Sequence, residues 1–333
     1  MTTATPEAVK QQCEQFRATY AGLQEEVGKV IVGHRDVIDG VLTGLFVGGN
    51  ILLEGVPGLG KTLLVRTLAD TLSLAFSRIQ FTPDLMPSDI TGTNIVMEDP
   101  GTGHRKFEFS KGPVFANIVL ADEINRATPK SQSAMLEAMQ EHSVTIGGVQ
   151  HKLPSPFLVM ATQNPIEQEG TYPLPEAQLD RFMFSIEVDY PSEAEEVEIV
   201  ERTTGELGPE PEAVIDRPTL LQLQALVRNH LDHDDVPRFA VALARATRPG
   251  PNAPEVVNRY VQWGAGPRAS QFLLLGARVR SALHGRPNAT LDDVRAVATS
   301  VLQHRIVPSF AAEAEGLRSS EIVRQVLATM PRS

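Results

Sequence analysis

The sequence predicts an α/β core, with a parallel sheet and inserted β-hairpins, followed by an all-α domain. Three observations predict this fold: short apolar runs in the first half, a glycine-rich segment after one of them, and helical periodicity after residue 191. The chain has 333 residues, which is more than one compact domain usually holds. We therefore expect two domains, residues 1–191 and residues 192–333.

The sheet is predicted from three nearly continuous apolar runs, at residues 50–53, 118–121 and 157–161. Strands that are apolar on both faces are typical of the centre of a parallel sheet covered by helices. Each run ends in polar residues or glycine. In open α/β sheets the ligand lies outside the carboxyl ends of the strands, so these ends are expected to meet at one site.

Two hairpins are predicted between these units. Residues 95–97 and 106–109 flank a turn-rich stretch at 99–103. Residues 144–146 and 149–151 flank Gly147 and Gly148, and two glycines between strands are a strong hairpin signal. The hairpins could be sheet edges or working loops on the rim of the domain.

Helix-capping signals mark the second half. Ser192 with Glu195, and Thr290 with Asp293, have the spacing of a capping box. Helical spacing of apolar residues predicts helices near residues 219–231, 237–247, 267–284 and 290–303.

Composition excludes several classes of protein. The chain is 42% hydrophobic and 21% charged, as globular proteins are, and its net charge of −11 disfavours sequence-independent nucleic-acid binding. A single cysteine, Cys13, excludes an intrachain disulfide and a cysteine metal cluster. The most apolar stretch, residues 41–53, is too short and too interrupted to span a bilayer, and we expect a cytoplasmic protein.

Residues 55–62 fit the phosphate-binding pattern G-x-x-x-x-G-K-[ST]. The pattern follows a predicted strand and opens a helical stretch, which is the context it requires. Its backbone N–H groups and the helix N-terminus would bind phosphate. Lys61 would reach the β- and γ-phosphates, and the Thr62 hydroxyl would ligate Mg²⁺.

Two further strands end in residues suited to nucleotide hydrolysis. Asp122 and Glu123 follow the second apolar run, where Asp122 would hold Mg²⁺ and Glu123 would deprotonate the attacking water. Asn164 follows the third run and could hold that water without adding charge. The alternatives without a functional role are that Asp122 and Glu123 form an ordinary acidic strand end and that Asn164 belongs to an Asn-Pro turn.

Two arginines are weaker candidates. Arg181 lies at the end of a predicted helix and could act on a neighbouring subunit's phosphate, but the residues alone favour a surface ion pair with Asp180. Arg268 lies at the start of a predicted helix, where a cation gains nothing from the helix dipole. Such a local misfit is typical of functional sites, although an exposed arginine is the alternative.

Taken together, these motifs resemble those of AAA+ ATPases, and in detail those of the MoxR family. The likeness runs from about residue 25 to beyond residue 300. Its most specific stretches are FTPDLMPSD, from Phe81 to Asp89, and PEAQLDRF, from Pro175 to Phe182. The likeness also rests on residues 31–34, 55–62, 112–115, 121–127 and 161–165.

The resemblance implies a P-loop AAA+ core followed by a helical lid, with ATP and Mg²⁺ as cofactors. It implies a catalytic role for Glu123, a first-sensor role for Asn164, a trans-acting arginine finger at Arg181 and a second sensor at Arg268. Thr62 and Asp122 would hold the metal. The implied nucleotide contacts are Val32, Gly33, Gly55, Pro57, Gly58, Leu59, Gly60, Lys61, Thr62 and Leu63.

A trans-acting arginine implies a homo-oligomeric ring, expected to be a hexamer. The resemblance also implies a protein client, linked to a partner with a von Willebrand factor A domain. Two alternatives stay open, a magnesium-chelatase-like motor subunit and a nucleic-acid-dependent motor. A GTPase or small-molecule kinase is disfavoured because no Asn-Lys-x-Asp stretch is present to bind guanine. A scaffold protein without catalytic activity is disfavoured because each position expected to take part in hydrolysis carries a suitable residue.

Overall fold

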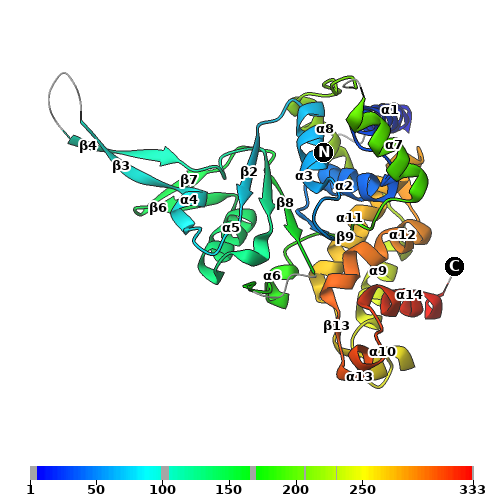
Figure 1. The fold of residues 1–333 in the computed structure, drawn as a ribbon. Coiled ribbons are helices and arrows are strands. Elements are labelled where there is room, and N and C mark those ends of the chain that lie inside the picture. Colours follow the sequence, from blue (N-terminus) through cyan, green and yellow to red (C-terminus); the bar gives the residue numbers. More distant parts are fainter. Residues whose placement is uncertain (1–5, 99–104, 166–169, 206–207, 230, 332–333) are drawn as a thin grey trace.

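The computed structural model describes residues 6–98, 105–165, 170–205, 208–229 and 231–331 (Figure 1). A five-stranded parallel sheet forms the core of the first half, in the order β2-β5-β8-β1-β9. Its strands are β1 (Ile51–Glu54), β2 (Phe76–Gln80), β5 (Ile118–Asp122), β8 (Leu158–Gln163) and β9 (Phe184–Glu187). The three predicted apolar runs became the three central strands, β5, β8 and β1.

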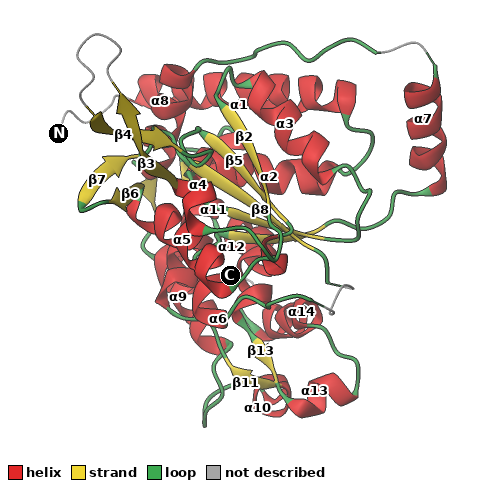
Figure 2. Ribbon diagram, turned by 60° about the vertical axis from the view of Figure 1, so that its left-hand side comes forward, coloured by secondary structure: helices red, strands yellow, loops and turns green. Residues whose placement is uncertain are grey.

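Side-chain alternation along β1 explains why the sheet is buried on both faces. Ile51 and Leu53 belong to one apolar cluster, whereas Leu52, which points to the opposite face, belongs to another. Helices α1, α2 and α3 cover the first face, and α4 and α5 cover the second (Figures 1 and 2). These helices are α1 (Pro6–Val30), α2 (Arg35–Val47), α3 (Lys61–Thr71), α4 (Pro87–Thr91) and α5 (Pro129–Glu141).

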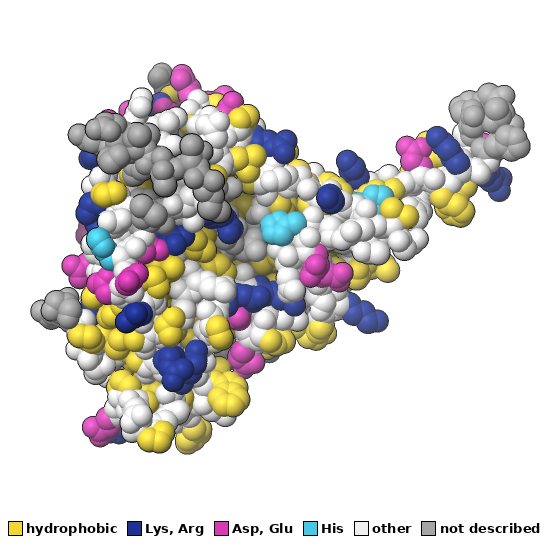
Figure 3. Space-filling model, turned by 180° about the vertical axis from the view of Figure 1, so that it is seen from behind, with side chains coloured by type: hydrophobic (Ala, Val, Ile, Leu, Met, Phe, Trp, Pro, Cys, Tyr) yellow, Lys and Arg dark blue, Asp and Glu magenta, His cyan; other side chains and the backbone are white. Residues whose placement is uncertain are grey.

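Both predicted hairpins are present. Strands β3 (Gly92–Glu98) and β4 (Arg105–Lys111) pair antiparallel, as do β6 (Ser143–Ile146) and β7 (Val149–Lys152). The β3–β4 hairpin projects from the core and carries exposed apolar side chains (Figure 3). One of them is Phe107, whose exposed fraction is 79%. The predicted turn at 99–103 lies outside the described residues.

The second half is helical, as predicted. Its helices are α7 (Glu193–Thr204), α8 (Arg217–Arg228), α9 (Asp235–Ala246), α10 (Glu255–Tyr260), α11 (Pro267–Leu283), α12 (Leu291–Leu302), α13 (Phe310–Ala314) and α14 (Ser319–Thr329), with a 3₁₀ turn η2 (Gln303–Arg305) after α12. Both predicted capping boxes form, at Ser192 with Glu195 and at Thr290 with Asp293. Four strands of two or three residues accompany the helices: β10 (Leu231–Asp232), β11 (Val261–Trp263), β12 (Asn288–Ala289) and β13 (Val307–Pro308).

The apolar core continues from the sheet into the helical half. The cluster that contains Ile51 and Leu53 also contains Leu273 of α11 and Val301 of α12. Helices α11 and α12 therefore pack beside α2 and β9 (Figure 1). The division of the chain near residue 191 stays a prediction. None of the described helices is long and apolar enough to cross a membrane.

Candidate nucleotide site

The glycine-rich loop joins β1 to α3, as the pattern requires. β1 ends at Glu54, and α3 begins at Lys61. Gly58 and Gly60 have φ angles of 86° and 74°, in the left-handed region that glycine adopts without strain. A Cβ at either position would meet no atom within 4 Å, so the loop borders open space at the N-terminus of α3. This space and the helix N-terminus together fit a phosphate group.

Lys61 lies folded against the loop. Its Nζ donates to the carbonyl oxygens of Gly55, at 2.6 Å, and Val56, at 2.8 Å. Burial lowers the pKa of Lys61, and the nearby carboxylates of Asp122 and Glu123 oppose that shift. The ammonium therefore has two loop carbonyls as its described acceptors, which a terminal phosphate would replace.

Asp122 ends β5 and is 7% exposed. The hydroxyl of Thr162 donates to its Oδ1 at 2.6 Å, and the hydroxyl of Thr62 lies 3.3 Å from its Oδ2. Carboxylate and hydroxyl oxygens are the ligands that Mg²⁺ takes in nucleotide sites. The arrangement of Thr62 and Asp122 thus fits the predicted metal ligands.

Arg78 of β2 also binds Asp122. Its Nη2 lies 2.7 Å and its Nε 2.9 Å from Oδ2, the oxygen that faces Thr62. The same Nη2 donates to Oε1 of Gln80. A cation therefore covers the carboxylate oxygen where a metal would bind.

Glu123 follows the strand in a left-handed conformation, with φ of 56°. Its backbone N–H donates to Thr162 Oγ1 at 2.8 Å, which fixes this backbone turn. The Glu123 carboxylate accepts hydrogen bonds from Gln80 Nε2, at 2.7 Å, and Arg126 Nη1, at 3.2 Å. Arg78 and Gln80 thus link the carboxylates of Asp122 and Glu123 in one network.

Asn164 comes directly after β8 and is 6% exposed. Because Glu54 pairs with Gln163 in parallel register, Asn164 lies at the same edge of the sheet as the loop at 55–60. Asp122 ends β5, which lies on the other side of β8 from β1. The predicted convergence of three strand ends at one site is therefore present.

Arg181 lies at the other end of the strands, just before the amino end of β9. Ile51 at the start of β1 pairs with Phe184 at the start of β9, and the N–H of Met183 donates to Asn50 O at 2.7 Å. Arg181 therefore precedes the strand whose far end lies beside the P-loop. Within the described residues its side chain makes no hydrogen bond or ion pair.

Arg268 lies beside Arg181 rather than beside its own P-loop. Its Nη1 is 3.2 Å from Asp180 Oδ2 and 3.3 Å from Asp180 O. The surface ion pair expected between Arg181 and Asp180 is thus replaced, because the ion-pair partners of Asp180 are Arg268 and Arg305. The two candidate arginines share one edge of the fold, away from the triphosphate-binding loop.

Comparison with known proteins gives the same architecture. Residues 50–184 match the model of the ATPase family associated with various cellular activities, and residues 254–326 match an AAA lid domain. The crystal structure of a proposed ATPase from Cytophaga hutchinsonii superposes with a TM-score of 0.88 and 40% identity, covering 98% of both chains. Chaperone MoxR1 of Mycobacterium tuberculosis is 46% identical over 92% of this chain and 80% of its own length. Protein MoxR of Methylorubrum extorquens is 32% identical, over 95% and 96%.

The chain belongs to the MoxR family of AAA+ ATPases. Membership confirms the predicted fold and the predicted class of enzyme, an ATP hydrolase that binds nucleotide. The roles of single residues in this MoxR family chain stay predictions.

The segment predicted to contact adenine borders a pocket. Val32 and Gly33 line a cavity of about 430 Å³ together with Glu198 and Arg202 of α7. Arg202 Nη1 donates to the carbonyls of Gly28 and Lys29, at 3.1 Å each. Helix α7, at the edge of the molecule in Figure 2, is thereby joined to the end of α1 beside the predicted adenine segment.

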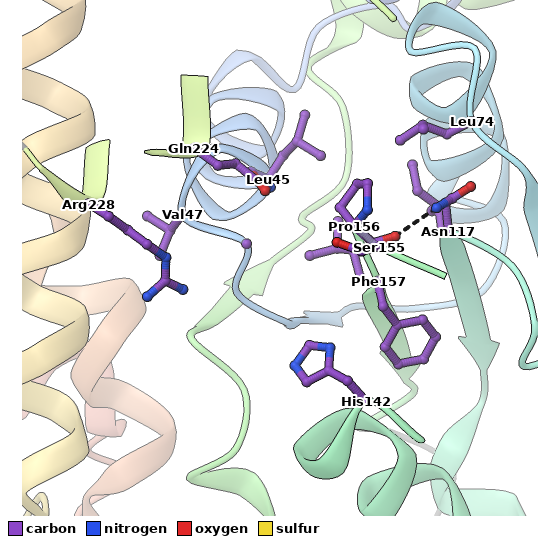
Figure 4. A pocket seen from close by; sticks show the side chains of 13 residues that line it. Leu45, Val47, Leu74, Asn117, His142, Ser155, Pro156, Phe157, Gln224 and Arg228 are labelled. Atoms are coloured by element: carbon purple, nitrogen blue, oxygen red, sulfur yellow. Dashed lines mark hydrogen bonds between the residues drawn. The ribbon is translucent and has the colours of Figure 1, made fainter. Parts of the chain in front are cut away.

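Another pocket lies away from this chemistry. A cavity of about 140 Å³ is lined by residues that include His142, Phe157 and Arg228, whose side chains are labelled in Figure 4. It lies at the amino ends of β5 and β8, because Ile118 and Leu158 line it. Ligands of such sheets bind at the carboxyl ends, and we assign this cavity no part in nucleotide binding.

Sequence reasoning missed Arg78, Gln80 and Thr162 as members of the site. Arg78 and Gln80 are two residues apart in β2, so both side chains point to the same face of the sheet. Polar residues at alternate positions of a strand beside Asp122 were the available signal. Thr162 was visible only as part of the stretch at 161–165.

Proposed function

We propose that this MoxR family chain hydrolyses ATP at the interfaces of a ring, expected to be a hexamer, and so remodels, assembles or activates a protein client. The observation that carries the proposal is the position of Arg181 and Arg268 at the edge opposite the P-loop. This position supports a role toward a neighbouring chain's nucleotide rather than toward the chain's own. A neighbouring chain's triphosphate is the acceptor that suits both.

Within one chain, the described contacts support the division of labour in ATP hydrolysis. Lys61 would bind the terminal phosphates, and Thr62 and Asp122 would hold Mg²⁺, which neutralises charge on the phosphate oxygens. Glu123 would take the proton of the attacking water, and Asn164 would orient that water. Both hydrogen bonds described at this carboxylate, from Gln80 and Arg126, go to Oε2, so Oε1 is the oxygen that would take the proton.

Between chains, two cations would complete the site. Arg181, whose side chain is not held by any described residue, would stabilise charge on the transferring phosphoryl group of the neighbour. Arg268, bound to Asp180, would contribute a second cation from the lid. The lid and the finger would then move as one unit when the interface closes.

The proposal that the client is a protein rests on the relatives of this chain. One relative is named a chaperone, which supports work on a protein. A partner with a von Willebrand factor A domain is proposed from the family likeness alone. The projecting β3–β4 hairpin, with Phe107 exposed at 79%, is a surface that such a client could contact. A magnesium-chelatase-like motor or a nucleic-acid motor is the alternative, and stimulation of turnover by single-stranded DNA would favour the latter.

The test is complementation between two inactive variants. Arg181→Ala chains keep an intact hydrolytic site, and Glu123→Gln chains keep an intact arginine. Mixing them should restore ATP turnover above that of either variant alone, at interfaces where Glu123→Gln chains serve Arg181→Ala chains. Absence of any recovery would contradict an arginine acting in trans.

A further inference from the structure

Two consecutive residues of the helical half, His304 and Arg305, bind the segment that carries Arg181. This segment, residues 180–183, connects α6 (Glu176–Leu179) to β9 and belongs to neither element. Its partner is η2 (Gln303–Arg305), directly after α12. Helix α6 and the 3₁₀ turn are in contact although more than a hundred residues separate them in the chain.

Arg305 makes most of these contacts. Its Nε donates to Asp180 Oδ1 at 2.8 Å, its Nη2 to Asp180 O at 3.0 Å and to Phe182 O, and its Nη1 to Met183 O at 3.2 Å. The guanidinium therefore binds backbone carbonyls on both sides of Arg181. Its planar set of donors suits several fixed acceptors at once, which a lysine cannot match.

The guanidinium is held inside the protein. The side chain of Arg305 is 1% exposed, and its guanidinium lies 5.1 Å from the centre of the Phe272 ring on α11. Burial lowers the pKa of Arg305 to about 10, while Asp180 opposes the shift, so the side chain stays charged at neutral pH. A buried charge of this kind is stable only with its full set of partners, which the 180–183 segment and the carbonyl of Val301 supply.

The neighbours of Arg305 extend the contact. Gln303 Nε2 donates to Ser185 O at 2.8 Å, beyond the start of β9. His304 Nε2 lies 3.1 Å from Phe182 O, and burial holds the pKa of His304 well below its usual range, so the ring is neutral. The three residues together fix the backbone from Asp180 to Ser185.

We propose that Arg305 is the positioning residue of the Arg181 finger, fixing its backbone to the lid so that lid and finger approach the neighbouring chain together. The inference rests on the proposed function, in which Arg181 acts in trans. Arg268 joins the same assembly, because Asp180 accepts from Arg268 through Oδ2 and from Arg305 through Oδ1. Because its side chain is buried, Arg305 would act through this backbone and not by contact with nucleotide.

The test compares Arg305→Met with a matched variant, Arg295→Met. Arg295 is also an arginine of the helical half that binds backbone carbonyls, of Leu327, Met330 and Pro331, and lies over a phenylalanine ring, at 5.0 Å from Phe239. None of the hydrogen bonds described for Arg295 goes to the 180–183 segment. Any general effect of losing such an arginine should appear in both variants, whereas an effect on the finger should appear only in Arg305→Met.

For Arg305→Met we expect kcat to fall about tenfold to a hundredfold with little change in the KM for ATP, because a misplaced finger fails in the transition state. Mixing with Glu123→Gln chains should restore turnover, since the hydrolytic site of Arg305→Met is intact. Arg305→Lys, which keeps the charge beside Asp180, should lose less activity. If Arg305→Met does not fold, the kinetics and mixing of Arg305→Lys decide.

The mixture of Arg181→Ala chains with Glu123→Gln chains distinguishes the trans-acting role of Arg181 from the positioning role of Arg305. Recovery with Arg181→Ala but not with the Arg305 variant would overturn the positioning role and leave the trans-acting finger in place. Recovery with neither would overturn both. Equal losses of kcat in Arg305→Met and Arg295→Met would also overturn the positioning role, because the effect would then not depend on the finger segment.

Discussion

Arg78 and Asp122 form an ion pair with 2.7 Å between Nη2 and Oδ2, on the carboxylate oxygen that faces the Thr62 hydroxyl. A metal ion at Thr62 and Asp122 has to displace this guanidinium. The Arg78 side chain is 49% exposed, so the pair contributes little to stability and opens readily.

We expect Arg78→Ala to lower the Mg²⁺ concentration that half-saturates nucleotide binding by about two- to fivefold, the range open to a half-exposed ion pair. The measurement is the Mg²⁺ dependence of binding of a fluorescent ATP analogue. Arg324→Ala, which breaks an exposed pair with Glu321, is the control. An unchanged or higher Mg²⁺ requirement would show that Arg78 does not compete with the metal.

Lys61→Ala should reduce nucleotide affinity by about a hundredfold or more, because the phosphates lose the cation held at the mouth of the loop. Equilibrium binding of the same analogue measures the loss. Lys130→Ala, on the exposed side of α5, should bind normally. Undiminished affinity in Lys61→Ala would refute the assignment of the P-loop.

Glu123→Gln should keep ATP binding and lose at least about a hundredfold in turnover, because an amide cannot accept the proton of water. The amide can still meet Gln80, so the site should keep its geometry. Single-turnover hydrolysis and binding, measured on the same preparation, separate the two effects. A fully active variant would remove Glu123 as the base.

Asp293 gives a prediction for pH. Burial alone would raise its pKa, but hydrogen bonds from Arg286 and Thr290 outweigh burial and lower the pKa below its ordinary value of 3.8. The ionised form is therefore favoured in the folded state, and its contribution to stability is present above the unfolded pKa and lost as pH falls through the folded pKa.

Asp293→Asn should accordingly reduce the free energy of unfolding at pH 7 by about 1–3 kcal/mol, and the difference from the parent should shrink below about pH 4. Denaturant unfolding across this pH range is the measurement. Asp292→Asn, one residue away on the exposed side of α12, is the control. A difference that does not depend on pH would contradict the role of the charge.

Local patterns were sufficient to predict the three strands whose carboxyl ends meet at the candidate site. The runs before Glu54, Asp122 and Gln163 are apolar because they lie in the middle of the sheet, and their polar ends were visible as breaks. Strand β2 was not predicted individually, since only Ile79 in it is buried and the strand lies at the edge of the sheet.

The position of the arginines could not be predicted from local patterns. That Arg181 lies opposite the P-loop follows from the parallel register of β9 on β1, which depends on the whole fold. Arg305 was missed for a related reason. Charged residues are almost never fully buried, and its burial depends on carbonyls more than a hundred residues earlier in the chain.

The P-loop lies at the carboxyl ends of the sheet strands, whereas Arg181, with Arg268 beside it, lies at the amino end of β9. Any assembly that brings the P-loop of one chain to these arginines of another is therefore head-to-tail. Such a contact has a direction, and it must either close on itself or grow without limit. In such a contact, a defect in one chain would show its effect in the neighbouring chain. In the proposed ring, a mutation at Arg181 would spare the hydrolytic site of the chain that carries it and disable that of the next, so altered chains would also impair unaltered chains in the same ring.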